Sequence, residues 1–393
     1  MPWKFASAIG ERTRFVRAAL QQRQPFAALC REFGISRRTG YKWCHRFQQN
    51  GRAGLQLRSR RPRTSPRRTP RRWQQFIRRL RQRRPHWGAK KIHARLRHKF
   101  PRARLPAVRT ITQWLPKLCP HVRRRRRHTR RGPRLDLPAL TQPAAPNEVW
   151  TVDFKGFFRT ADGTRCDPLT VRDLFSRFLL AVRVLPHQRQ DAVRRVFIRL
   201  FRRHGLPKVI RVDNGSPFGS TAAWGLATLS VWWRTLGIAV EFIRPGHPEE
   251  NGSHEQMHRE LKRDTARPPA AHLQAQQHRS NRWRRDYNTA RPHEALGGRY
   301  PAERYHRSRR RYRGPQPIRY PRGSSVRRVR HNGEIKWQGR RRFIGEPFAG
   351  QPIALRLQAA GVYEVYFQTL PLGILHDRDA GGLRPSKPRR AKK

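Results

Sequence analysis

The sequence predicts an α/β core, a mixed sheet flanked by helices, with all-α modules before it and a small all-β domain after it. Apolar residues recur at helical spacing in residues 8–50 and 72–118, which predicts helices there. Residues 147–265 show strand and helix patterns in the order βββ-α-β-α-β-α, which favours a mixed sheet with helices packed on it. Residues 316–376 alternate short strands with turns, as expected of a small β-barrel or sandwich.

The charge of the chain indicates its partner. The 393 residues include 90 Lys and Arg against 24 Asp and Glu, a formal net charge of +66. This excess repels itself unless a polyanion neutralises it, so we expect a nucleic acid rather than a small-molecule substrate. No membrane partner is expected, because no run approaches the ~20 apolar residues of a spanning helix. Arg far outnumbers Lys, which suits phosphate and guanine contacts, although a GC-rich genome explains this bias equally well.

The first predicted module, residues 8–50, has the outline of a helix-turn-helix. Gly34 ends one helix, and Ser36 can cap the next. In DNA-binding proteins with this motif, the second helix lies in the major groove. The side chains of that helix expected to contact DNA are Arg37, Arg38, Tyr41, Lys42 and Arg46. The alternative is a basic surface helix that makes no specific contact.

Segments of biased composition separate the predicted domains. Residues 51–71 combine Pro, Ser and Arg and are interpreted as a basic linker. Residues 72–120 repeat the helix-turn-helix outline as a second DNA-binding module, and residues 121–146 form a basic, Pro-rich linker that also contacts phosphate. The α/β core extends over residues 147–305, and residues 377–393 form a basic tail that we expect to be disordered.

Three acidic residues fall at the ends of predicted core elements, where the ligand sites of α/β sheets gather. Asp153 lies in the first strand, Asp213 ends the fourth strand, and Glu255 lies in the first turn of the last helix. Glu11 and Glu32 are the only acidic residues before residue 136, so any catalytic carboxylates are expected in the second half of the chain. Carboxylate oxygens suit Mg²⁺ or Mn²⁺, and two such ions can activate a nucleophile and stabilise a leaving oxygen. We therefore expect two divalent ions, bridged by Asp153.

The residues around Glu255 predict how this acid is held. Ser253 is the expected N-cap of its helix, with Gln256 as the capping-box partner. The helix N-terminus then stabilises the ionised carboxylate of Glu255 by ~0.3–1 kcal/mol. Arg259 and Lys262 follow on the same helix face, where we expect them to bind the phosphates of DNA.

Other candidate residues have ordinary explanations. Asp173 is either a fourth acid of the site or a residue with a turn or salt-bridge role, and the turn or salt-bridge role is favoured. His247, His254 and His258 are flanked by Glu and Arg without a fourth ligand, so zinc is not expected. The four cysteines form no CxxC pair, which argues against a disulfide scaffold. The chain opens without a signal-peptide pattern, so a cytoplasmic protein is expected.

Four segments resemble the signature blocks of the integrase-core (DDE) transposases of bacterial insertion sequences. They read VWTVDFKG, VIRVDNGSPF, RPGHPEENGSHEQMHRELK and YNTARPHEALGGRYPAE, in this order along the chain. These transposases are relatives of retroviral integrase, and the resemblance implies a ribonuclease H-like fold for the core. It also assigns the catalytic, metal-binding triad to Asp153, Asp213 and Glu255.

The third acid has a competitor. With 35 residues between it and Asp213, Glu249 has the separation that is common in the family. Glu249 and Glu250 precede an Asn-Gly step and are expected in a loop, whereas Glu255 lies on a helix. A metal ligand must be held by a rigid element, so Glu255 is the preferred residue.

The resemblance implies a metal-dependent DNA transposase. Such an enzyme binds the ends of its own mobile element in double-stranded DNA, cleaves a strand and joins the 3′ end to target DNA. Two ends are processed together, so a homodimer or higher oligomer is expected, associated with the bacterial nucleoid. The alternative is a non-enzymatic, sequence-specific DNA-binding protein, either a regulator or a decayed transposase. An RNA-binding protein is supported by charge alone.

Overall fold

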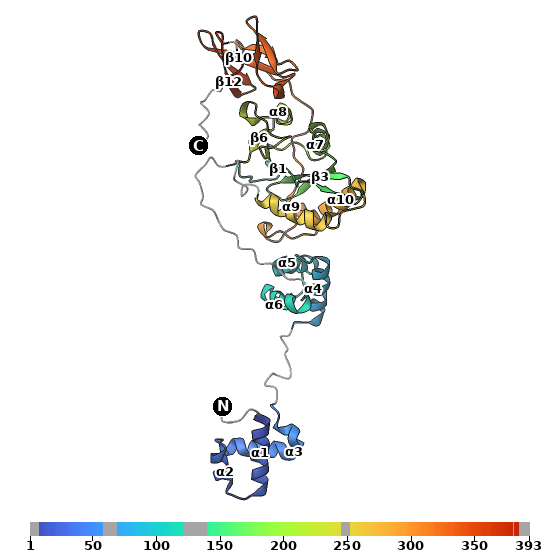
Figure 1. The fold of residues 1–393 in the computed structure, drawn as a ribbon, viewed down its shortest axis with the longest axis vertical. Coiled ribbons are helices and arrows are strands. Elements are labelled where there is room, and N and C mark those ends of the chain that lie inside the picture. Colours follow the sequence, from blue (N-terminus) through green and yellow to red (C-terminus); the bar gives the residue numbers. More distant parts are fainter. Residues whose placement is uncertain (1–7, 58–68, 121–139, 245–251, 380, 385–393) are drawn as a thin grey trace. The chain divides into compact units, whose positions relative to one another are not determined.

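The computed structural model describes residues 8–57, 69–120, 140–244, 252–379 and 381–384 (Figure 1). The chain divides into two compact units between Thr69 and Pro70. A search of the described residues finds no helix with the length and apolar character to cross a membrane.

The first unit is a three-helix domain that confirms the predicted helix-turn-helix. Its helices are α1 (Ala8–Gln21), α2 (Phe26–Glu32) and α3 (Arg37–Asn50). Between α2 and α3, Gly34 has a φ of +64°, and the Ser36 hydroxyl accepts a hydrogen bond from the Thr39 N–H at 3.2 Å. The turn and the N-cap are therefore those that the sequence predicts.

The first linker begins later than the sequence predicts. Residues Gly51–Leu55 form a 3-10 helix, and Leu55 is fully buried in the core of the first unit. The guanidinium of Arg12 donates to the Leu55 carbonyl at 2.9 Å and fixes this turn to α1. A single leucine in a basic segment is a weak signal in the sequence, yet it binds residues 51–55 to the helical core. Residues 58–68 lie outside the described part of the chain.

The second helical module begins the second unit. It consists of α4 (Arg71–Arg83), α5 (Ala89–Lys99) and α6 (Val108–Leu118). Its core is formed by Trp73, Ile77, Trp87, Ile92, Leu96 and Ile111. The three predicted helices are therefore present. The arginine run in the predicted linker 121–146 lies outside the described residues, which resume at residue 140.

The α/β core contains the predicted mixed sheet. Its strands are β1 (Val149–Phe154), β2 (Phe158–Arg159), β3 (Arg165–Asp173), β4 (Leu179–Leu185), β5 (Val209–Val212) and β6 (Ala239–Phe242). The strand order is β4-β3-β1-β5-β6, and the short β2 pairs with the start of β3. β3 is antiparallel to β1 and β4, whereas β5 is parallel to β1 and β6. Strand β1 therefore lies at the centre of the sheet.

Helices cover both faces of this sheet. They are α7 (Gln190–His204), α8 (Thr228–Thr235), α9 (Gly252–Thr265), α10 (Leu273–Thr289) and α11 (Pro301–Arg304), with 3-10 turns at Ala223–Gly225 and Glu294–Leu296. Helices α7 and α8 share a large apolar core with Trp150 and Val152 of β1. Helices α9 and α10 pack against β4 through a separate cluster that includes Met257 and Trp283 (Figure 1).

The C-terminal domain is all-β, as predicted, but its strands do not form one continuous barrel. The strands are β7 (Ser325–Arg328), β8 (Glu334–Trp337), β9 (Arg340–Phe343), β10 (Pro352–Ala359), β11 (Val362–Phe367) and β12 (Leu370–His376). Four form an antiparallel sheet in the order β12-β11-β10-β7, and β8 and β9 form a separate hairpin. A common core joins the hairpin to the sheet, with a 3-10 turn at Glu346–Phe348 between them in sequence.

Part of the predicted C-terminal tail is ordered. Arg384 and Ile374 exchange two backbone hydrogen bonds, at 2.8 and 2.9 Å, so the chain returns along β12. The Arg384 side chain also donates to the Asp379 carboxylate at 2.7 Å. The prediction of disorder from residue 377 is therefore wrong for this segment, because a few backbone pairings add it to the sheet edge. Residues 385–393 lie outside the described chain.

Candidate active site

Asp153 and Asp213 lie at the ends of two neighbouring parallel strands. In the register of β1 and β5, Thr151 lies opposite Arg211. Continuing this register by two residues sets Asp153 beside Asp213, the residue that directly follows β5. The Asp153 side chain is 20% exposed, whereas Asp213 is exposed to solvent. The topology thus brings together two carboxylates that are far apart in sequence, at the edge where α/β sheets bind ligands.

Glu255 comes to this edge from the first turn of α9. The helix begins at Gly252, so Glu255 is its fourth residue rather than its second, as the predicted Ser253 cap implied. The residues before Gly252, which include the competing Glu249 and Glu250, lie outside the described part of the chain. Glu255 is exposed, and its charge is close enough to Asp153 to raise the pKa of that carboxyl group.

The electrostatics of the acids fit a divalent cation. Burial, followed by the repulsion of Asp213, raises the pKa of Asp153 to about 7, and Lys155 opposes the shift. Partial loss of water also raises the pKa of Asp213, although backbone N–H groups, including that of Gly215, stabilise its charge. Converging carboxylates that resist ionisation are stabilised by a bound cation, and their oxygen donors match the preference of Mg²⁺ and Mn²⁺. Asp153 and Asp213 therefore suit such a metal, and Glu255 is a further carboxylate oxygen donor close to Asp153.

Basic side chains lie beside the acids. Arg259 and Lys262 are exposed on α9. Lys155, which sequence reasoning missed, directly follows β1 and is half-buried. Burial and the charge of Lys262 lower the pKa of Lys155, while Asp153 and Glu255 oppose that shift. Lys155 and Lys262 thus combine with the acids in one charged cluster, where a phosphate group would find both signs of charge.

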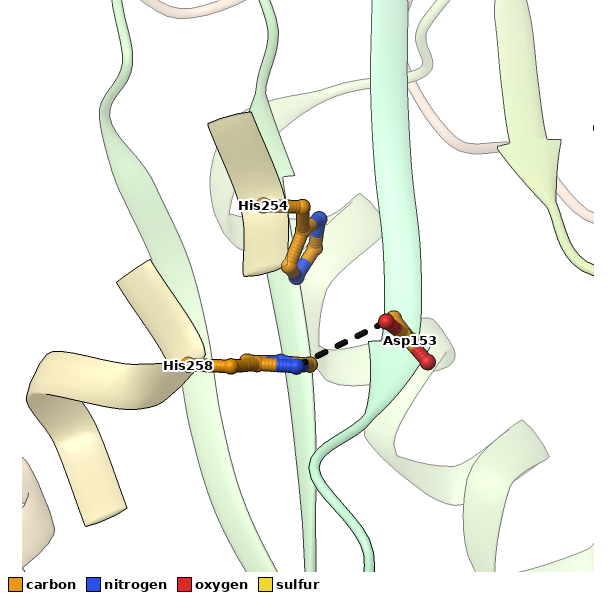
Figure 2. Close-up of side chains that lie close together, drawn as sticks. All are labelled: Asp153, His254 and His258. Atoms are coloured by element: carbon orange, nitrogen blue, oxygen red, sulfur yellow. Dashed lines mark ion pairs between the residues drawn. The ribbon is translucent and has the colours of Figure 1, made fainter. Parts of the chain in front are cut away.

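Two buried histidines of α9 lie behind Asp153 (Figure 2). His258 Nδ1 is 3.5 Å from Asp153 Oδ2, and the Nε2 atoms of His258 and His254 both lie 2.6 Å from the hydroxyl of Thr170. Burial lowers the pKa of His258 to about 3 and that of His254 well below its usual value. Both imidazoles are therefore neutral at neutral pH, and the His258–Asp153 contact drawn in Figure 2 is then a polar contact between a neutral ring and the carboxyl group.

Sequence reasoning treated these histidines only as unsuitable zinc ligands. Their potential ligand atoms, with that of Asp153, do lie within 4.8 Å of one another. The signal that was missed is the spacing in HEQMH, which places positions 254 and 258 four residues apart and hence on one helix face. That face packs toward the sheet, whereas Glu255 remains exposed.

Asp173 has the turn role that the sequence favours. Its carboxylate accepts hydrogen bonds from the backbone N–H groups of Asn147 and Ser176, at 2.7 and 2.8 Å, and from the Ser176 hydroxyl. It pairs with Trp150 near the start of β1, not with Asp153. Asp173 therefore closes the turn after β3.

The predicted DNA-contacting residues of the first unit lie on α3. Arg37, Arg38, Tyr41 and Lys42 are exposed, and Arg46 is half-buried with its guanidinium 5.2 Å from the Trp43 ring centre. The Tyr41 ring stacks on Phe26 of α2 at 4.3 Å between centroids. The second helix of the motif thus presents a basic surface that also bears an aromatic ring.

Family comparisons match every domain of the chain. Two integrase core domain families match residues 143–248 and 236–301. A helix-turn-helix domain family matches residues 11–63, and a homeodomain-like family matches residues 39–115. The C-terminal domain of IS481 family transposases matches residues 324–379.

Proteins of bacterial insertion elements are among the similar sequences. A 31.7 kDa protein of insertion element IS407 from Burkholderia multivorans is 33% identical over 184 residues, which are 46% of this chain and 62% of that protein. A 39.2 kDa protein of IS476 from Xanthomonas euvesicatoria is 27% identical over 224 residues, 55% of this chain and 60% of its own length. The chain thus spans about three fifths of these relatives.

Retroviral integrases are among the similar solved structures. The HTLV-2 integrase catalytic core domain in complex with magnesium is 16% identical and covers 42% of this chain and 100% of its own, with a TM-score of 0.31. A simian T-cell lymphotropic virus intasome in complex with a PP2A regulatory subunit is also 16% identical and covers 76% of this chain and 95% of its own, with a TM-score of 0.37.

Proposed function

Since the chain belongs to the integrase-core transposases of the IS481 family, we propose that it cleaves the DNA ends of its own mobile element and joins their 3′ ends to target DNA. The observation that carries this proposal is the meeting of Asp153 and Asp213 at adjacent strand ends, with Glu255 close enough to raise the pKa of Asp153. These three side chains are the proposed catalytic residues and would hold two Mg²⁺ or Mn²⁺ ions.

The proposed chemistry divides between the ions and the chain. Bound divalent ions supply the means to make a water or a 3′-hydroxyl nucleophilic and to stabilise the leaving oxygen. The chain fixes the ligands on β1, after β5 and on α9, so the acids are pre-arranged before DNA binds. Arg259, Lys262 and Lys155 bind the DNA phosphates and hold the scissile bond beside the acids.

DNA recognition is assigned to the helical modules. In this proposal α3 enters the major groove of the element end, with Arg37, Arg38, Tyr41, Lys42 and Arg46 as its contacts. The basic linkers and the second module bind phosphates and add affinity that falls with salt. Because two ends are joined to one target, the active form is a homodimer or a higher oligomer.

The competing function is a DNA-binding protein without enzymatic activity. Helix-turn-helix modules fit both functions, whereas a buried carboxyl group beside other acids adds nothing to DNA binding. Purified protein is mixed with labelled element ends, and nicking is followed with Mg²⁺ and with EDTA. We expect Mg²⁺-dependent nicking that Asp153→Asn abolishes while end binding is retained. Binding without nicking in the wild-type protein would overturn the proposal.

A further inference from the structure

The sheet face behind Asp153 contains a column of buried polar side chains. Thr151 of β1 is 2% exposed, Thr170 of β3 and His254 of α9 are 0% exposed, and His258 of α9 is 3% exposed. Polar groups are costly in a protein interior unless they hydrogen-bond to one another. Four such groups in contact therefore need a specific arrangement of protons.

The contacts run in one line from Thr151 to Asp153. The Thr151 hydroxyl is 2.9 Å from His254 Nδ1, and His254 Nε2 is 2.6 Å from the Thr170 hydroxyl. That hydroxyl is 2.6 Å from His258 Nε2, and His258 Nδ1 is 3.5 Å from Asp153 Oδ2. Each imidazole uses both of its nitrogen atoms, so neither ring can turn over without losing a partner.

Counting donors gives the line a direction. A neutral imidazole has one N–H and one bare nitrogen, and a threonine hydroxyl has one proton. If His258 donates from Nδ1 to the Asp153 carboxylate, its Nε2 must accept from Thr170. Thr170 must then accept from His254 Nε2, and His254 Nδ1 must accept from Thr151. In this direction each hydrogen-bond donor in the line faces one acceptor.

The opposite order of donors, from His258 toward Thr151, fits the distances less well. With the proton on His258 Nε2, a bare Nδ1 faces the Asp153 carboxyl group, and two acceptors oppose each other once that group is ionised, as it must be to bind a metal. In this direction Thr170 donates to His254 Nε2 and His254 Nδ1–H donates to Thr151, which leaves the Thr151 hydroxyl to donate to the Arg172 carbonyl at 3.4 Å. That contact is longer than the 2.9 Å between the Thr151 hydroxyl and His254 Nδ1, to which Thr151 donates in the first direction.

We propose that His258 is a positioning residue that holds the Asp153 carboxylate through Nδ1–H, and that Thr170, His254 and Thr151 fix its tautomer and ring orientation. This inference rests on the proposed function of Asp153 as a metal ligand. Residues that orient a ligand in this way often change metal affinity or activity by 10–100-fold when they are replaced. The histidines thus act through Asp153 and do not touch DNA or metal themselves.

The test uses two amide replacements of similar size. The Nδ2 amide of Asn occupies roughly the place of imidazole Nδ1, whereas the amide of Gln reaches roughly the place of Nε2. His258→Asn therefore keeps a donor for Asp153, and His258→Gln removes it. Mn²⁺ binding to the full-length protein is measured directly, from the electron paramagnetic resonance signal of free Mn²⁺, with thermal unfolding as the check on folding.

We expect His258→Gln to weaken Mn²⁺ binding by about 10–100-fold and His258→Asn to bind close to wild type. Thr170→Ser, which keeps the hydroxyl, should also bind like wild type, and Thr170→Val should weaken binding. The inference is overturned if folded His258→Gln binds like wild type, or if both amides weaken binding equally. It is also overturned if Co²⁺ gives a visible absorption band that depends on His254 and His258, because they would then be metal ligands.

Asp153→Asn separates this inference from the proposed function. If Asp153→Asn loses Mn²⁺ binding while His258→Gln does not, only the positioning role is wrong. If wild type and Asp153→Asn bind Mn²⁺ equally, Asp153 is not a ligand, and the proposed metal site is wrong together with the inference that rests on it.

Discussion

The two faces of strand β1 show how one strand serves both stability and chemistry. Trp150 and Val152 point into the apolar core under α7 and α8. Thr151 and Asp153 alternate with them and meet the polar residues of α9. One face therefore stabilises the fold by burying apolar area, whereas the other buries polar groups whose hydrogen bonds and charges must be satisfied. The difference predicts that substitutions on the two faces separate stability from activity.

The largest effect on stability is expected on the apolar face. Trp150 is fully buried and its indole N–H donates to the Asn147 side chain at 3.0 Å. Trp150→Ala should lower the free energy of unfolding by ~3–5 kcal/mol, because it leaves a cavity in the central core. Urea denaturation measures this, with the exposed Phe157→Ala as a control that should change stability by less than ~0.5 kcal/mol. Equal losses in both variants would contradict the packing described here.

At Asp153 we expect the opposite effect, because replacing this side chain should raise the free energy of unfolding. Its pKa is about 7 in the folded protein against 3.8 ordinarily, so the unfolded chain loses this proton at lower pH than the folded chain. Stability is therefore lost between about pH 4 and pH 7 and stays reduced above pH 7. Without metal, Asp153→Asn should be more stable than wild type by on the order of 3 kcal/mol at pH 8, and similar to it near pH 4.

Denaturation in EDTA at the two pH values measures this difference. Addition of Mn²⁺ should then stabilise the wild type and leave Asp153→Asn unchanged, since binding to the folded state alone raises its stability. If Asp153→Asn were less stable than wild type at pH 8 without metal, the folded protein would not be disfavouring the ionised carboxylate of Asp153.

Exchanging a polar and an apolar side chain at two neighbouring positions of β1 tests the difference between its two faces. Thr151→Val removes the hydroxyl next to His254, and Val152→Thr adds one to the apolar face. Each should lower the free energy of unfolding by ~1–3 kcal/mol, because each leaves a buried polar group without a partner. Thermal unfolding of both variants tests this. Greater stability of Thr151→Val would show that the hydrogen bonds of the polar face do not stabilise the fold.

The smallest effect is expected at the exposed bases of α9. Arg259→Ala and Lys262→Ala should leave stability within ~0.5 kcal/mol of wild type. Each should weaken DNA binding and reduce the salt dependence, with the slope of log K against log salt falling by about 0.9 per lost phosphate contact. Binding titrations across a salt series measure the slope. An unchanged slope in both variants would show that Arg259 and Lys262 do not contact DNA phosphates.

Much of the fold follows from patterns that are local in sequence. A run of apolar and β-branched residues predicts β1, and the order of the strands and helices that follow predicts the mixed sheet. Asp153 and Asp213 stand out because each falls toward the end of such a strand. Gly34 and Ser36 likewise predict the turn of the first unit, because the chemistry of a turn and a cap lies within a few residues.

What the sequence did not predict depends on contacts between distant residues. Thr170 contacts His254 and His258 across separations of 84 and 88 residues, and no local pattern marks a threonine in a strand as their partner. Leu55 is a similar case, since one leucine in a basic segment shows its burial only once α1 and α3 have formed a core. The closure of a barrel also depends on pairing between strands, which turn signals do not specify.

The most direct test of the proposed triad compares Glu255→Gln with Glu249→Gln. Nicking of labelled element ends is measured for both full-length variants at saturating Mg²⁺, with end binding as the check on folding. We expect Glu255→Gln to reduce nicking to background and Glu249→Gln to nick like wild type. Loss of nicking in Glu249→Gln with activity retained in Glu255→Gln would contradict the assignment of the third acid to α9.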